Sequence, residues 1–315
     1  MYAAVPQIKT NMAITNPQLQ TGADDGIAIS KYHILDTGSC HTFATTLLRG
    51  QPWRSIRCHC LVALLHHPKH GWILWDTGYA SHIFQATQRF PWRLYRFVTP
   101  LYFQPELSIV RQLPGLGLTP DDITHVIVSH LHGDHTAGLR DFPRAKFIVS
   151  RAAWEDMRVR KGINALRRAI IPALIPEDFA ERAIFTDEFP GAIEGALGPT
   201  FDLFGDGSLR LFPLPGHARG QLGMLAKISQ SSPSEIGNKN FLDGDFLFTA
   251  DSCLHRASAY TGILPSRLTY LIADDVSAVA SSIQRLHTFV SANSAVIVIP
   301  THCPETYHDF IGAEP

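Results

Sequence analysis

The side chains best suited to chemistry lie in one short stretch, SHLHGDH, at positions 129–135 of a chain of 315 residues. Residues two apart in an extended segment point the same way, so His130 and His132 can offer imidazole nitrogens to one ion. The glycine that follows permits a sharp turn, after which Asp134 and His135 can face a second ion. Imidazole and carboxylate ligands without thiolate are typical of hydrolytic zinc sites.

Three further residues of metal-ligand type occur in the same setting, directly after a β-rich run. THVIVS leads to His130, and the runs LRLFPLPG, DFLFTA and AVIVIPT lead to His217, Asp251 and His302. A strand fixes where the backbone emerges, and the loop after it lets a side chain turn inward. We therefore predict that these four strand ends converge on one metal site.

Taken together, these motifs resemble those of the metallo-β-lactamase superfamily. SHLHGDH is similar to the H-x-H-x-D-H motif of that family, and WDTG at 75–78 is similar to the strand and turn before it. Its three later ligand motifs correspond, in order, to Pro215-Gly216-His217, Thr249-Ala250-Asp251 and Pro300-Thr301-His302. The resemblance runs from about Lys31 to His302. It implies an α/β fold, an αββα sandwich of two mixed β-sheets packed face to face with helices outside and a dinuclear metal site at one edge.

The resemblance also implies a role for each residue of the motifs. One metal would be held by His130, His132 and His217, the other by Asp134, His135 and His302, with Asp251 bridging both. Asp76, from WDTG, would orient a ligand imidazole, as such sites usually require. The implied cofactors are two divalent metal ions, Zn²⁺ in the first place, with Fe and Mn as alternatives.

Within the superfamily, the layout is most similar to the N-acyl-homoserine lactonase branch, with one departure. That branch has a tyrosine three residues after the bridging aspartate, where it contacts the substrate carbonyl. This chain has Leu254 there, followed by His255. Tyr79, Tyr260 or His255 could supply a comparable group, and nothing in the sequence selects among them.

We expect a metal-dependent hydrolase that cleaves an ester-like bond, in the first place a lactone. A hydroxide that bridges the two metals would attack the carbonyl carbon, and Asp134 would pass the proton to the leaving oxygen. The alternatives on the same fold are a metal-dependent phosphodiesterase or nuclease and a mononuclear-iron sulfur dioxygenase. A third class, a binding protein without catalysis, ranks last because no ligand of the motifs is missing.

The elements that must position these groups follow from hydrophobic patterning and turn residues. We expect strands over 31–38, 57–67, 71–78, 124–129, 145–150, 209–214, 221–228, 245–250 and 295–300. Residues 151–188 read mainly as helix, and a second helix opens at Asp274 and Asp275 with apolar residues at helical spacing. The segments 57–67 and 71–78 form a hairpin, and we expect the histidines beside its turn, His66, His67 and His70, to be surface residues rather than metal ligands.

The segment 79–118 is unusually aromatic. Phe84, Trp92 and Phe103 are candidates, with Tyr79, for lining a substrate pocket. The segment is either a lid over that pocket or irregular helices packed against the body, and it is equally compatible with the surface of a homodimer. We expect one domain over 31–315 with this insertion, preceded by an irregular arm at 1–30.

The composition limits which classes of binding partner the protein can have. Lys+Arg 27 against Asp+Glu 28 gives a net charge of −1, which does not favour a nucleic-acid partner. No apolar run approaches the ~20 residues of a membrane-spanning helix, so we expect no membrane partner. An odd number of cysteines, five, favours a reducing compartment. The sequence therefore predicts a cytoplasmic protein with a small-molecule substrate.

Overall fold

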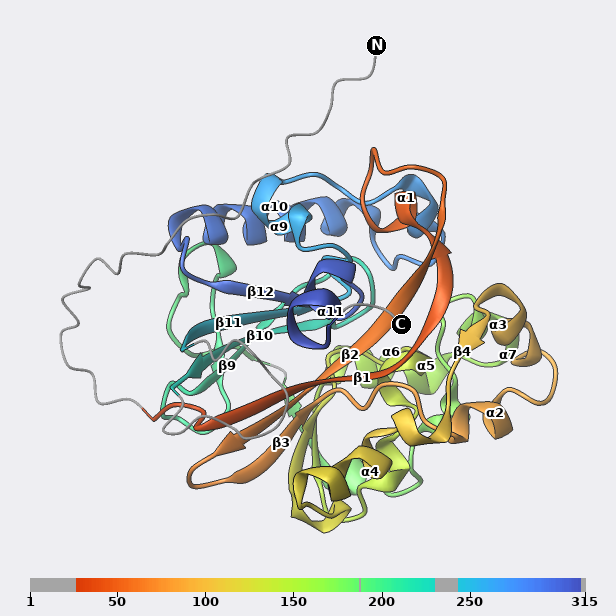
Figure 1. The fold of residues 1–315 in the computed structure, drawn as a ribbon, viewed down its shortest axis with the longest axis horizontal. Helices are drawn as coiled ribbons and strands as arrows, with labels where there is room; N and C mark the ends of the chain where they lie inside the picture. Colours follow the sequence, from red (N-terminus) through yellow and green to blue (C-terminus); the bar gives the residue numbers. More distant parts are fainter. Residues whose placement is uncertain (1–26, 187, 230–242, 313–315) are drawn as a thin grey trace.

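The computed structural model describes residues 27–186, 188–229 and 243–312. Most of the predicted arm at 1–30 lies outside these residues. Within them, two β-sheets pack face to face with helices on both outer sides (Figure 1). The predicted αββα sandwich of mixed sheets is therefore confirmed.

The larger sheet has seven strands in the order β4-β1-β2-β3-β5-β6-β7. Its strands are β1 (Lys31–Phe43), β2 (Ser55–His67), β3 (Gly71–Trp75), β4 (Leu101–Tyr102), β5 (Ile123–Ile127), β6 (Lys146–Ser150) and β7 (Ala183–Thr186). The strands β1, β2, β3 and β4 pair antiparallel, whereas β3, β5, β6 and β7 are parallel. The carboxyl ends of the four parallel strands therefore meet at one edge of the sheet.

The smaller sheet has five strands in the order β12-β11-β10-β9-β8. Its strands are β8 (Phe201–Asp202), β9 (Leu209–Pro213), β10 (Leu222–Ile228), β11 (Gly244–Ala250) and β12 (Ile297–Pro300). Because β10 is antiparallel to both β9 and β11, and β11 is parallel to β12, the strands β9, β11 and β12 run the same way. Their carboxyl ends lead into the loops that carry the three later predicted ligands.

Most helices of the described chain are short. They are α1 (Ala44–Leu47), α2 (His82–Ala86), α3 (Arg93–Val98), α4 (Ile109–Gln112), α5 (Gly133–Thr136), α6 (Arg151–Val159), α7 (Gly162–Leu166), α8 (Phe179–Arg182), α9 (Ala257–Thr261), α10 (Val276–Ala292) and α11 (Pro304–Phe310). In the described part of the chain, no helix combines the length and apolar character needed to span a membrane. The longest helix, α10, begins after Asp275, whose carboxylate accepts hydrogen bonds from two backbone N–H groups of its first turn.

Three buried clusters hold the layers together. The central one joins the inner faces of both sheets through residues such as Leu65 of β2 and Phe246 of β11. A second packs the larger sheet against α4, α6 and α8, and a third packs the smaller sheet against α9 and α10. Burial of apolar surface on both faces explains why the parallel strands read as continuous hydrophobic runs.

Two sequence expectations about elements need correction. Residues 151–188 are not mainly helix, because extended backbone at Arg160 and Lys161 separates α6 from α7, the prolines at 172 and 176 separate α7 from α8, and the end of the segment forms the edge strand β7. The predicted strand at 31–38 continues to Phe43, because its residues pair with β2 beyond a bulge at Asp36–Ser39. The hairpin of β2 and β3 is confirmed.

Candidate metal centre

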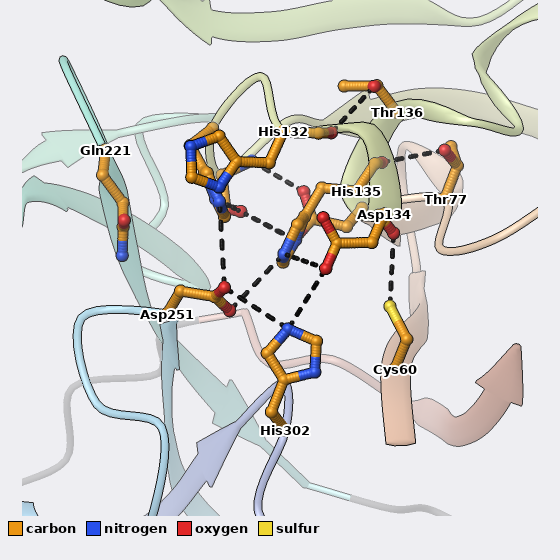
Figure 2. A network of polar contacts seen from close by, with 12 residues as sticks. Cys60, Thr77, His132, Asp134, His135, Thr136, Gln221, Asp251 and His302 are labelled. Carbon is orange, nitrogen blue, oxygen red and sulfur yellow. Dashed lines mark hydrogen bonds and ion pairs between the residues drawn. The ribbon is translucent and has the colours of Figure 1, made fainter. Parts of the chain in front are cut away.

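The predicted ligands meet where the carboxyl ends of strands from both sheets converge. His130, His132, His217 and Asp251 form one group of potential ligands, and Asp134, His135, Asp251 and His302 form a second. In each group the potential ligand atoms all lie within 4.8 Å of one another. Asp251 belongs to both groups and lies between them (Figure 2). Residues far apart in the sequence thus form two adjoining sites.

The first group is positioned by the ends of β5, β9 and β11. Its histidines come close to each other, since His217 Nε2 lies 3.2 Å from His132 Nδ1. The carboxylate of Asp251 lies 3.4 Å from His217 Nε2 and 4.0 Å from His130 Nε2. The loop after β5 is fixed to the other sheet because Leu222 N donates to the carbonyl of Ser129.

The second group uses the short helix α5 and the end of β12. His302 Nε2 lies 3.3 Å from both Asp134 Oδ2 and Asp251 Oδ2. His135 Nε2 lies 3.4 Å from Asp251 Oδ1 (Figure 2), whereas the other oxygen, Oδ2, faces His302 and the histidines of the first group. Side-chain exposure is 15% for Asp134 and 5% for Asp251, so Asp134 is the carboxylate nearer the solvent.

Hydrogen bonds on the outer nitrogens orient two of the imidazoles. His302 Nδ1 donates to the backbone carbonyl of His59 at 2.6 Å, and a carbonyl can only accept. His135 Nδ1 donates to Asp76 Oδ2 at 2.8 Å. Both histidines therefore direct an Nε2 lone pair into the cluster, which is the arrangement that metal ligation requires.

Asp76 occupies a backbone conformation that is uncommon for a residue with a side chain, with φ at 61°. Its carboxylate also accepts from Ser129 N and Ser129 Oγ at 2.8 and 2.7 Å. Ser129 Oγ in turn lies 3.0 Å from His130 Nδ1. Sequence reasoning found Asp76 but missed Ser129 and His59, because a serine or a backbone carbonyl gives no distinctive signal in a single sequence.

Several polar atoms at the centre of the cluster are buried and have no hydrogen-bond partner among the residues that the structure describes. These atoms are His130 Nε2, His135 Nε2 and Asp251 Oδ1. Leaving such atoms unpaired costs free energy in a buried site. All three atoms can coordinate a divalent metal ion through a lone pair, so the residues present fit two such ions.

The electrostatics of the cluster separate its histidines into two kinds. Burial, reinforced by neighbouring histidines, lowers the pKa of His132 to about 3 and lowers the pKa of His130 well below its usual value. Burial also opposes protonation of His135 and His302, but nearby carboxylates, Asp251 foremost, outweigh it and raise the pKa of both. Negative charge is therefore concentrated around the second group, where a cation can replace the shared protons.

The loop that carries His217 is pressed against the start of α10. Gly216 has φ at 130°, and a Cβ atom there would lie 2.4 Å from Val279 N. Asp275 N donates to the carbonyl of Gly216, and Asp274 N donates to the carbonyl of His217. Glycine is required here because any side chain would separate this loop from α10.

The predicted pocket residues fall into three places. Tyr79 is 1% exposed with an unpartnered hydroxyl, and it packs with Cys60, whose thiol donates to the carbonyl of Asp134. Phe84, Trp92 and Phe103 pack partly buried on the same apolar cluster. Tyr95 of α3 is a further buried phenol in this cluster, and it was not among the predicted candidates.

His255 and Tyr260 lie elsewhere. His255 borders a groove of about 680 Å³ with Arg57 and Glu305, beyond the loops that carry Asp251 and His302. Tyr260 is half-exposed on α9, beside the Val298 backbone. Neither residue belongs to the two groups that share Asp251, but His255 forms a separate group of potential ligand type with Cys303 and Glu305.

The histidines of the β2–β3 hairpin need a correction. His67 is 0% exposed rather than a surface residue. Its Nε2 donates to Asp206 Oδ2 at 2.9 Å, and its Nδ1 accepts from the backbone N–H groups of Lys69 and His70. The loop before β9 covers it, which a local pattern of turn residues could not indicate.

The fold and the cluster together define a class of protein, and comparison with known proteins supports the same class. The family model of the metallo-beta-lactamase superfamily matches residues 56–223, more than half of the chain. The chain belongs to the metallo-β-lactamase superfamily, as the motifs predicted.

Among curated proteins, the chain is similar to N-acyl homoserine lactonases. It is 30% identical over 207 residues to the lactonase AttM of Agrobacterium fabrum, an alignment that covers 64% of this chain and 66% of AttM. It thus spans slightly less than two thirds of the length of that relative. To AttM of Azorhizobium caulinodans it is 28% identical over 256 residues, or 78% of this chain and 82% of the relative.

Solved structures show the same fold at lower identity. An N-acyl homoserine lactone hydrolase with the product N-hexanoyl-L-homoserine at its catalytic metal centre superposes with a TM-score of 0.66 at 21% identity, covering 89% of this chain and 95% of that one. AidC, a dizinc quorum-quenching lactonase, superposes with a TM-score of 0.57 at 18% identity, covering 89% and 90%.

Proposed function

We propose that this protein is a hydrolase that uses two divalent metal ions, in the first place Zn²⁺, to open lactones. The observation that carries the proposal is the position of Asp251, which belongs to both groups of potential ligands and has a buried, unpaired oxygen. A carboxylate shared in this way can hold two ions next to each other. Two adjacent ions, when bound, would supply a water of lowered pKa and a Lewis acid for the carbonyl oxygen.

The chain's own residues would hold the metal ions, orient the ligand imidazoles and carry protons. His130, His132 and His217 would hold one ion, and Asp134, His135 and His302 the other. Asp76 keeps His135 in the tautomer that leaves Nε2 free, and the His59 carbonyl does the same for His302. Asp134 is the more exposed carboxylate of the cluster. It is therefore the group placed to accept a proton from the attacking water and return it to the leaving oxygen.

A lactone substrate is supported by two observations. The curated relatives are named N-acyl homoserine lactonases, and the wall beside Asp134 is apolar, with Phe84 and Phe103 packed 5.7 Å apart between ring centres. An apolar wall suits an acyl chain better than a polyanion. Leu254 occupies the position of the tyrosine that the lactonase branch places there.

The test is metal analysis combined with a substrate panel. Purified protein loaded with zinc is assayed on N-acyl homoserine lactones, an aryl ester and bis-p-nitrophenyl phosphate. We expect two metals per chain, selective turnover of lactones, and a loss of kcat/KM of more than about a hundredfold in His132→Ala. Equal rates for His132→Ala and the unaltered protein would overturn the proposal.

The other chemistries give different results in the same panel. Preferred turnover of the phosphodiester would indicate a phosphodiesterase, and one iron per chain with no hydrolysis would indicate the dioxygenase. No feature of the described residues favours either.

The cytoplasmic location and the homodimer stay predictions. The five cysteines are free, as is expected in a reducing compartment.

A further inference from the structure

One side of the aromatic insertion is exposed, apolar and basic. Between Asp76 and Glu106 the sequence contains no acidic residue, but it contains Arg89, Arg93 and Arg96. The short helix α3 lies in this stretch at the periphery of the molecule (Figure 1), and its Tyr95 belongs to one apolar cluster with Leu101 of β4 and Leu166 of α7. We call the exposed residues of this segment the α3 surface: Arg89, Phe90, Arg93, Leu94, Phe97 and Val98.

The apolar side chains of the α3 surface are unusually open to solvent. Phe97 is 82% exposed, Val98 73%, Phe90 69% and Leu94 43%. Tyr95 of the same helix is buried at 4%. The helix therefore anchors one side in the protein and presents large apolar side chains on the other. Solvation of such a patch is costly, which marks it as an interaction surface.

The arginines of this surface lack acidic partners. Arg89 and Arg93 are exposed, and no ion pair of either is found in the described residues. A groove of about 500 Å³ adjoins Arg89, and its lining includes Phe90 and Arg140. Two arginines that line one groove suit a phosphate group, because the planar donors of a guanidinium match phosphate oxygens.

We propose that the α3 surface binds an anionic phospholipid bilayer, with Phe90, Leu94, Phe97 and Val98 inserted at the interface and Arg89, Arg93 and Arg140 on lipid phosphates. Exposed aromatic and aliphatic residues combined with arginine are the composition of interfacial membrane segments. Contact of this kind needs no spanning helix, so it does not depend on the apolar run that the sequence lacks.

A second copy of the chain fits this surface less well. A two-fold contact centred on this surface would bring the arginines of both copies together, and no acidic residue of the segment could neutralise them. An anionic bilayer complements both the charge and the apolar side chains. Charge complementarity therefore selects the lipid surface over the homodimer.

Membrane contact would serve the proposed reaction directly. Tyr95 packs in the same apolar cluster as Cys60, and the Cys60 thiol donates to the backbone carbonyl of Asp134 at 3.2 Å. The α3 surface is thus the outer side of the wall that borders the second ligand group. Substrates with long acyl chains concentrate in bilayers and would reach the site from there. Only this consequence rests on the proposed lactonase function; binding itself does not.

The test is flotation of the full chain with vesicles of phosphatidylcholine, with and without phosphatidylglycerol. We expect binding to the anionic vesicles that weakens with added salt. Phe97→Ser/Val98→Ser should reduce the partition coefficient at least about tenfold because two inserted side chains are lost. Arg89→Glu/Arg93→Glu should reduce it by on the order of thirtyfold, since each basic residue near such a surface contributes about fivefold.

A matched control lies on another rim of the molecule. Arg267→Glu/Leu271→Ser alters an exposed arginine and an apolar residue that is 78% exposed, and it should leave vesicle binding unchanged. Sedimentation and circular dichroism check that each variant is folded and report its oligomeric state. The proposal is wrong if the unaltered protein does not float with anionic vesicles, if the control loses binding equally, or if the α3 variants only convert a dimer to a monomer. Lactone turnover in detergent-free buffer is measured separately and tests the reaction alone.

Discussion

Asp76 and His135 lie 59 positions apart in the sequence, yet His135 Nδ1 donates a hydrogen bond of 2.8 Å to Asp76 Oδ2. The same carboxylate accepts two hydrogen bonds from Ser129. It therefore ties the end of β3, the loop after β5 and the helix α5 into one unit. Both residues are almost completely buried, at 1% and 0% exposure, so solvent cannot replace this contact.

Replacing Asp76 by asparagine should weaken the second metal site. Asparagine has only one acceptor atom in its side chain, so it cannot accept from Ser129 N and from His135 Nδ1 with separate oxygens as the carboxylate does, and the hold on the His135 tautomer is weakened. We expect metal affinity at that site to fall by about 10- to 100-fold. Competition with a chromophoric chelator measures the change. Asp121→Asn, an exposed carboxylate paired with Arg144, is the matched control, and an unchanged affinity in Asp76→Asn would contradict the assignment.

The shared position of Asp251 predicts different metal contents for two variants. His302→Ala removes a ligand of one group, so the protein should retain one metal per chain. Asp251→Asn removes a ligand of both groups and should lose both metals. Elemental analysis after dialysis gives the ratios. His308→Ala, an exposed histidine of α11, should keep two metals, and two metals retained in Asp251→Asn would rule out the shared role.

Gly216→Ala should destabilise the protein and disturb the His217 loop together. The new Cβ would meet Val279 N at 2.4 Å, and φ at 130° is unfavourable for any side chain. We expect a loss of more than about 2 kcal/mol in the free energy of unfolding, measured by urea denaturation. Gly205→Ala is the control: it also has positive φ, at 74°, but an open surrounding, and it should cost about 1 kcal/mol. Equal losses in the two variants would show that the contact with α10 is unimportant.

His125 should make the stability of the protein sensitive to mild acid. Burial first, then Lys146 and His70, lowers the pKa of His125 to about 4 from its usual 6.5. The unfolded chain therefore takes up a proton as the pH falls below 6.5 while the native state does not, so stability is lost on acidification. When the pH falls from about 7.5 to about 5.5, the free energy of unfolding of His125→Gln should decrease by about 1 kcal/mol less than that of the unaltered protein. Urea denaturation at both values checks this, and parallel losses would refute it.

Much of the site was predictable because ligand motifs are local. SHLHGDH places two imidazoles, a carboxylate and a third imidazole within six positions, and His217, Asp251 and His302 each follow a strand that a short hydrophobic run reveals. Covalent spacing and strand direction decide these positions. The structure brings all seven residues together in the two predicted groups.

The predictions that were wrong concern residues whose burial or pairing depends on a segment far away in the sequence. His67 sits beside a turn and looks like a surface residue, but the loop that carries Asp206 covers it. The segment after β6 has helical composition, but its last residues pair with β6 as an edge strand. In both cases a distant segment supplies the partner.

The sequence by itself determined the family, the order of the strands that end in potential ligands, and which residues are those potential ligands. Each of these depends on short-range spacing and on side-chain chemistry. Only the tertiary structure decided that Asp76 reaches His135, that the His59 carbonyl orients His302, and that α3 buries Tyr95 while it exposes Phe97. Burial and hydrogen-bond pairing are set by segments far apart in the chain, and a local pattern carries no information about which of them will meet.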